Sequence, residues 1–128
     1  GKISVHNFWM AVDPGIALQP HNIVAQMESK IIYGLSQSIK EQVTLENGPV
    51  QQSNFHDYPV VRMAAAPAIE THIINSGAQI GGAGEPGTPG IAPALANAVF
   101  EATGTRVRQL PLSKYDFTYS IEEPEEVI

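Results

Sequence analysis

The feature that most restricts how this chain can fold is a glycine-dense segment at residues 77–90. Its 14 residues include six glycines and two prolines, so it offers few side chains for packing, and the prolines remove two of the backbone donors that a regular helix or strand would use. We therefore expect an irregular loop whose backbone other groups can approach closely.

The residues on either side of this loop predict a strand and a helix. Residues 68–74 alternate apolar and polar side chains, as a strand does. An alanine-rich stretch predicts a helix over 89–103, with Thr88 as its N-cap and Gly104 as its stop. Because its side chains are small, we expect other backbone to lie close to this helix, in its own domain or under a larger partner.

The first half of the chain predicts a strand, a helix and a hairpin. Residues 3–12 are rich in strand-forming side chains, Phe8 and Trp9 included, which we expect in the core. Residues 22–40 carry one broad apolar stripe at helical spacing. Residues 42–55 predict a β-hairpin that turns at Asn47-Gly48.

A last strand is predicted at residues 107–112, so strands and helices are interspersed along the chain. We expect the α+β class: a mixed sheet with two main helices. Residues 1–119 form the expected domain, and 120–128, with four glutamates, an acidic tail that is exposed to solvent.

The composition excludes several classes of function. A net charge of −6 argues against nucleic-acid binding, which needs a basic surface. The absence of cysteine excludes thiolate zinc sites, cysteine nucleophiles and cysteine-held iron–sulfur clusters. The four histidines follow no metal-ligand spacing, and no apolar run approaches the ~20 residues of a membrane span. The compartment stays open between bacterial periplasm and cytoplasm.

Three interpretations of the glycine loop stay open on the residues alone. Residues 82–87 match the dinucleotide pattern G-x-G-x-x-G, but Glu85 would repel a pyrophosphate, and Pro86 and Pro89 remove amide donors. The loop could instead be purely structural, with Glu85 exposed to solvent. In the third interpretation, Glu85 is a functional carboxylate that a flat substrate or cofactor can approach.

Several blocks of sequence resemble the molybdenum hydroxylases of the xanthine dehydrogenase/aldehyde oxidase family. Residues 80–98, IGGAGEPGTPGIAPALANA, resemble the G-x-G-E-P segment of that family, and 99–112 resemble its C-terminal ending. AVDPG, AQME, YGLS and QSNFHDYP at residues 11–15, 25–28, 33–36 and 52–59 agree with it in order and separation. The resemblance covers nearly the whole chain and is strongest to the isoquinoline 1-oxidoreductase beta-subunit type. It implies the C-terminal part of a molybdopterin-binding domain.

The resemblance also implies roles for individual residues. Glu85, the glutamate of G-x-G-E-P, would be the catalytic base, and Gln26, the glutamine of Q-x-E, would contact the molybdopterin. Gly82, Ala83 and Gly84 would let the loop backbone come close to the metal centre. The family usually has glycine after Q-x-E, whereas Ser29 and Lys30 stand here. A long charged residue such as Lys30 could change the packing near the pterin or contact a partner.

The activity implied is oxidation of an aldehyde or N-heterocycle, with water as the oxygen source. The cofactor would be molybdopterin with molybdenum, in its cytosine dinucleotide form, and 2Fe-2S clusters would lie on a small iron–sulfur partner subunit. The other partners implied are the remainder of the molybdenum subunit and cytochrome c as an electron acceptor. We expect no activity from this chain alone, and a non-catalytic interaction domain is the alternative.

Overall fold

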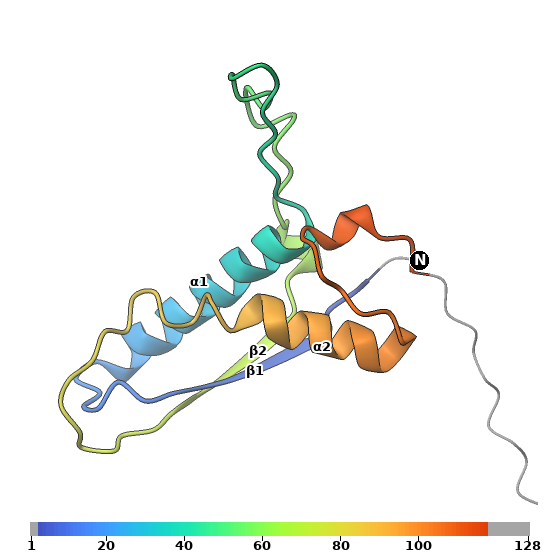
Figure 1. Ribbon diagram of the computed structural model, residues 1–128. Coiled ribbons are helices and arrows are strands. Elements are labelled where there is room, and N and C mark those ends of the chain that lie inside the picture. The colour runs from blue at the N-terminus through green and yellow to red at the C-terminus, as the bar shows by residue number, and fades with distance from the viewer. Residues whose placement is uncertain (1–2, 118–128) are drawn as a thin grey trace, which may run out of the picture.

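Two parallel strands and two helices form the frame of the chain, and the computed structural model describes residues 3–117 (Figure 1). Strand β1 spans Asn7–Val12 and pairs in parallel with β2, Ala68–Ile73. Helix α1 spans Pro20–Ile39 and helix α2 spans Ile91–Thr103. This arrangement confirms the α+β class, with a sheet of two parallel strands in place of the mixed sheet expected.

The sheet turns one face towards the helices and leaves the other open. Phe8 and Met10 on β1 and Ile69 on β2 are partly buried against the core, because alternate side chains point to the same side of a strand. Trp9 points the other way and is 64% exposed. The expectation that Phe8 contributes to the core is confirmed, and the same expectation for Trp9 was wrong.

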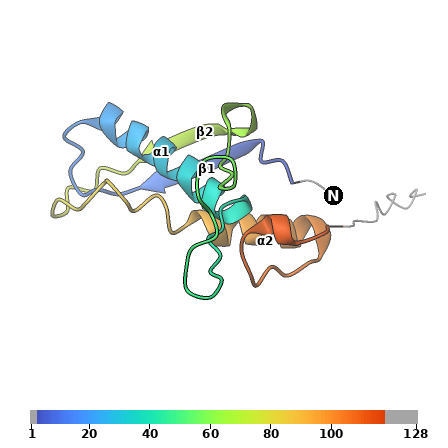
Figure 2. The same ribbon diagram turned by 90° about the horizontal axis from the view of Figure 1, so that it is seen from above.

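Helices α1 and α2 cross closely and form the main core. Viewed from above, α1 runs across the strands and α2 lies beside its C-terminal half (Figure 2). A Cβ atom on Gly34 would lie 2.5 Å from Cγ1 of Ile91, so the two helices meet where α1 has no side chain. Eight buried apolar residues make up this core: Ile31, Leu35, Ile91, Leu95, Val99, Val107, Leu112 and Phe117.

Residues 42–59 project from this body as an arm between α1 and β2 (Figure 1). Asn47 and Gly48 take φ angles of 53° and 107°, which confirms the predicted turn with two positive φ values. The ladder around this turn is short, because the strands meet in a single isolated bridge between Leu45 and Val50.

The strand predicted at residues 107–112 does not form. Tyr115 Oη accepts the backbone N–H groups of Arg108 and Gln109 at 3.1 and 3.0 Å, so a side chain takes the donors that a strand partner would use. The 3₁₀ turns η1, Met63–Ala65, and η2, Leu112–Lys114, complete the described elements. The acidic tail expected at 120–128 lies outside the described residues.

None of the helices described is long and apolar enough to cross a membrane.

Candidate functional site: a carboxylate on the glycine loop

The glycine loop is attached at its start to the turn that follows β1. The N–H of Gly77 donates to the carbonyl of Gly15, and that of Gly81 to the carbonyl of Pro14, both at 2.9 Å. Gly15 has a φ of +79°, and a Cβ there would lie 2.3 Å from the carbonyl oxygen of Gln79. Only glycine fits at position 15, so the turn after β1 and the start of the loop pack directly against each other.

Asp13 stabilises the same attachment. Its carboxylate accepts the Gly15 N–H and the Ser76 hydroxyl, both at 2.9 Å, which lowers the pKa of Asp13 below its usual value, the Gly15 bond contributing most. The turn D-P-G is therefore an anchor for the loop as well as the end of a strand.

The other end of the loop is pressed against α1 at Gly87. A Cβ atom there would lie 2.9 Å from Cβ of Lys30 and 3.1 Å from Sδ of Met27. These distances leave no room for a side chain. The loop therefore passes over α1 at a fixed place, two residues after Glu85.

Glu85 forms an ion pair with Lys30 across this contact. The Lys30 Nζ atom lies 3.0 Å from Oε1 of Glu85 and 5.5 Å from the centre of the Tyr33 ring. The Lys30 side chain is 17% exposed and that of Glu85 is 84% exposed. The cation is thus held within the chain, and the carboxylate stands at its surface.

The three residues before Glu85 present unused backbone donors. Within residues 3–117, the N–H groups of Gly82, Ala83 and Gly84 make no hydrogen bond. Nothing lies within 4 Å of a Cβ built on Gly82 or Gly84. This part of the loop can therefore receive a polar or anionic group at close range.

Gln26 lies on the side of α1 that faces this loop. It is exposed and precedes Lys30 by four residues, which places the two side chains one helical turn apart on one face. The structure therefore brings the glutamine of Q-x-E and the glutamate of G-x-G-E-P to the same side of the molecule. The motif's own glutamate, Glu28, lies two residues on and points elsewhere.

The Lys30–Glu85 pair is the part of this site that the sequence did not predict. Lys30 was noted only as a departure from the family pattern, because residues so far apart in the chain give no periodic signal of contact. The signal that could have suggested the pair is the positive charge of Lys30 beside the position where the family usually has glycine.

The beginning of α2 also differs from the prediction. The helix starts at Ile91 with Gly90 as its N-cap, and Thr88 instead belongs to the loop. The Thr88 N–H donates to the Glu85 carbonyl at 3.0 Å, and the Thr88 carbonyl accepts from Ile91 at 3.2 Å. A pair of tight turns thus links Glu85 directly to α2.

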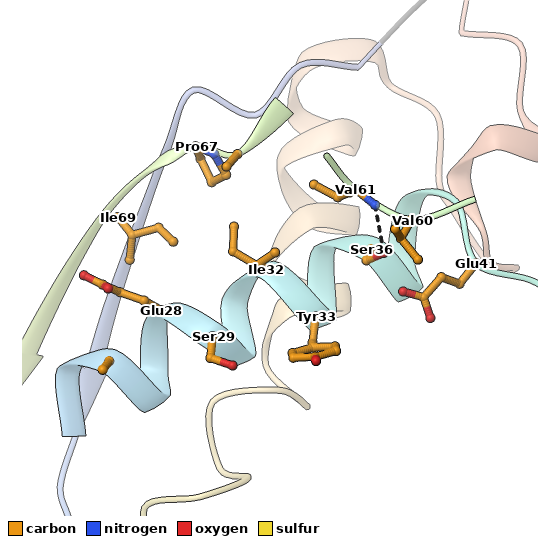
Figure 3. Close-up of a pocket in the computed structure, with 12 residues that line it drawn as sticks. Glu28, Ser29, Ile32, Tyr33, Ser36, Glu41, Val60, Val61, Pro67 and Ile69 are labelled. Carbon is orange, nitrogen blue, oxygen red and sulfur yellow. Dashed lines mark hydrogen bonds between the residues drawn. The ribbon is translucent and has the colours of Figure 1, made fainter. Parts of the chain in front are cut away.

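A groove of about 760 Å³ lies between α1, β2 and residues 60–67, and Tyr33, whose ring lies beside the Lys30 ammonium, also lines it (Figure 3). Its walls are mainly apolar, and Glu28 and Glu41 lie on its α1 side. At its far end the Val61 N–H donates to the Ser36 hydroxyl at 3.0 Å. Tyr58 donates to Glu41 at 2.8 Å, which raises the pKa of that tyrosine.

The groove has no grouping that suggests a metal site, and neither does the rest of the described chain. Residues 3–117 contain no cluster of three or more histidine, aspartate or glutamate side chains that could hold a metal ion.

No family model matches this chain. It is 42% identical over 110 residues to isoquinoline 1-oxidoreductase subunit beta of Brevundimonas diminuta, over 86% of this chain and 14% of that protein. The chain belongs to the molybdenum hydroxylase family. It corresponds to a short segment of the molybdopterin-binding subunit, so the family resemblance is confirmed.

Two further comparisons extend this result. A membrane-bound aldehyde dehydrogenase [pyrroloquinoline-quinone] of Gluconacetobacter polyoxogenes is 32% identical over 91% of this chain and 15% of that protein. CO dehydrogenase of Oligotropha carboxidovorans, at 21% identity, has the same fold over 82% of this chain and 14% of its own, with a TM-score of 0.71. This molybdenum hydroxylase segment thus spans a small part of the relatives that it matches.

Proposed function

We propose that this chain forms part of a molybdenum hydroxylase that oxidises an aldehyde or an N-heterocycle, with Glu85 as the general base. The observation that carries the proposal is the glycine loop: it holds a carboxylate beside three backbone N–H groups that bond to nothing within residues 3–117, on the side of α1 that carries Gln26. The family match supports the type of reaction.

The residues present fit a pterin cofactor in their chemistry. Gly82, Ala83 and Gly84 would donate backbone N–H groups to it, and Gln26 would add a side-chain amide. When bound, the molybdenum–pterin group supplies two-electron redox chemistry and activates water as an acid. The cytosine dinucleotide form is part of the proposal.

Glu85 would accept the proton that water loses as its oxygen bonds to an electron-poor substrate carbon. In this chain the carboxylate is 84% exposed, so the remainder of the molybdenum subunit would have to cover it. Exclusion of water strengthens a carboxylate as a base, and general-base help is worth about 10²–10⁴-fold in rate. We accordingly expect no turnover from this chain alone.

The electrons would leave through 2Fe-2S clusters on a small partner subunit, with cytochrome c as one acceptor. The chain has no cysteine to hold such clusters itself.

Replacing Glu85→Gln in the complete enzyme tests the proposal. We expect unchanged molybdenum and pterin content and a fall in kcat of about 10²–10⁴-fold, because the amide cannot accept the proton. Glu101→Gln, which removes an exposed carboxylate from α2, is the matched control and should keep full turnover. Near-normal turnover of the Glu85 variant would remove Glu85 from the reaction and favour a non-catalytic interaction domain.

The cofactor needs a separate measurement, because one relative is named for pyrroloquinoline quinone. Metal analysis of the natively purified complex should find molybdenum, and extraction should find a pterin. Pyrroloquinoline quinone without molybdenum would contradict the proposal.

A further inference from the structure

Lys30 has a fixed position from which it can direct Glu85. Its side chain is 17% exposed, its Cβ lies under the point where the loop passes at Gly87, and its ammonium lies 5.5 Å from the Tyr33 ring centre. Glu85, in contrast, is 84% exposed, and among residues 3–117 its side chain makes no hydrogen bond or ion pair other than the one with Lys30. The geometry of the pair is therefore set from the lysine side.

We propose that Lys30 is a positioning residue for Glu85: it holds the carboxylate against α1, in the place from which it accepts a proton. This inference rests on the proposed function of Glu85 as general base. The ammonium lies 3.0 Å from Oε1 of Glu85, so the ion pair fixes where the carboxylate lies. The attraction grows when a covering subunit excludes water, because the local dielectric constant falls.

Few other charges compete for Glu85 within the described residues. β1 approaches the loop through Met10, whose Sδ lies 3.5 Å from a Cβ built on Gly87 and carries no charge. From α1, Lys30 is the charged group that faces Glu85, since Glu28 lines the groove on another side of the helix. The loop residues 77–84 are uncharged.

The test compares kcat, KM and cofactor content of the complete enzyme with those of Lys30→Met, Lys30→Arg and Lys40→Met. Lys30→Met keeps the length of the side chain and removes its charge. We expect kcat to fall about tenfold with KM and cofactor content unchanged, because the base is no longer held in place. Lys30→Arg should restore most of the kcat, and Lys40→Met, at the far end of α1, should leave it unchanged.

A purely structural role for Lys30 would give a different result. Loss of packing alone would lower the thermal unfolding midpoint or the cofactor content together with kcat and would not be rescued by arginine, and that result would overturn the proposal. An unchanged kcat in Lys30→Met would also overturn it. A crystal structure of Lys30→Met should show the Glu85 carboxylate displaced from its place against α1; an undisplaced carboxylate contradicts the inference.

Comparison of Glu85→Gln with Lys30→Met separates this inference from the proposed function. If Glu85→Gln lowers kcat as expected while Lys30→Met has the wild-type kcat, the base stands and the positioning role fails. If Glu85→Gln retains turnover, the proposed function itself fails. With both correct, adding Lys30→Met to Glu85→Gln should cause little further fall in kcat, because the group that it positions is gone.

Discussion

The Asp57 carboxylate stabilises residues 53–57 of the arm through hydrogen bonds to its neighbours. It accepts the Ser53 N–H at 2.8 Å, and the Ser53 hydroxyl and Asn54 N–H at 2.9 Å. The backbone N–H of Asn54 contributes most to a pKa of about 2, against 3.8 for an ordinary aspartate. The conformation of residues 53–57 thus depends on one ionised side chain.

This low pKa makes the stability of residues 53–57 depend on pH. Because the pKa is lower in the folded arm than in the unfolded chain, the stabilisation is complete well above pH 3.8 and is lost as the pH falls towards 2. We expect amide hydrogen exchange of residues 53–57, corrected for its intrinsic pH dependence, to lose protection over that interval. Asp57→Asn should remove most of this pH dependence; a variant with the wild-type response would contradict the assignment.

The crossing of α1 and α2 depends on the absence of a side chain at Gly34. In Gly34→Ala the new methyl group would lie 2.5 Å from Ile91, which is fully buried and has little space to move. Alanine favours a helix by about 0.5–1 kcal/mol, but overpacking of a core costs about 1–3 kcal/mol. We therefore expect a lower thermal unfolding midpoint for the purified complex.

Gly90→Ala is the matched control for this substitution. Gly90 has a right-handed backbone conformation and no atom within 4 Å of the site of a Cβ, so its midpoint should barely change. Equal midpoints for Gly34→Ala and the wild-type protein would show that the helices can separate without cost.

The sequence predicted those elements whose signal is local and periodic. The stripe through Met27, Ile31 and Leu35 predicted α1, and all three side chains are buried. Gly104 was predicted to end α2, and it does so with a φ of 68°. Such signals depend on neighbours within a turn or two of the chain.

The errors have a common physical cause, which is competition from contacts that a local pattern does not describe. Residues 107–112 have the composition of a strand, but the hydroxyl of Tyr115 takes the backbone donors of Arg108 and Gln109. The same holds for the site: Glu85 could be singled out from its motif, whereas its pairing with Lys30 depends on where Gly87 crosses α1. A local sequence pattern does not predict where the loop crosses α1.

Several large apolar side chains of residues 3–117 are exposed. Phe55 is 90% and Met63 91% exposed, with Leu18 at 73% and Trp9 at 64%. The arm projects away from the body, and the chain spans 14% of the length of its Brevundimonas relative. In the proposed assembly, the remainder of the molybdenum subunit would cover such side chains.

The arm provides the test at this scale, because its Phe55 side chain is 90% exposed. We expect the natively purified complex to protect residues 53–57 from hydrogen exchange and to bury Phe55. Phe55→Ser should then weaken the assembly by about 2 kcal/mol or more, as loss of a buried aromatic anchor does. It should appear as a lower midpoint for dissociation of the complex. Glu46→Ser, an exposed polar change in the same arm, is the control and should leave that midpoint unchanged. A solvent-exposed Phe55 in the complete enzyme would contradict this prediction, because an apolar side chain that stays in water does not stabilise the assembly.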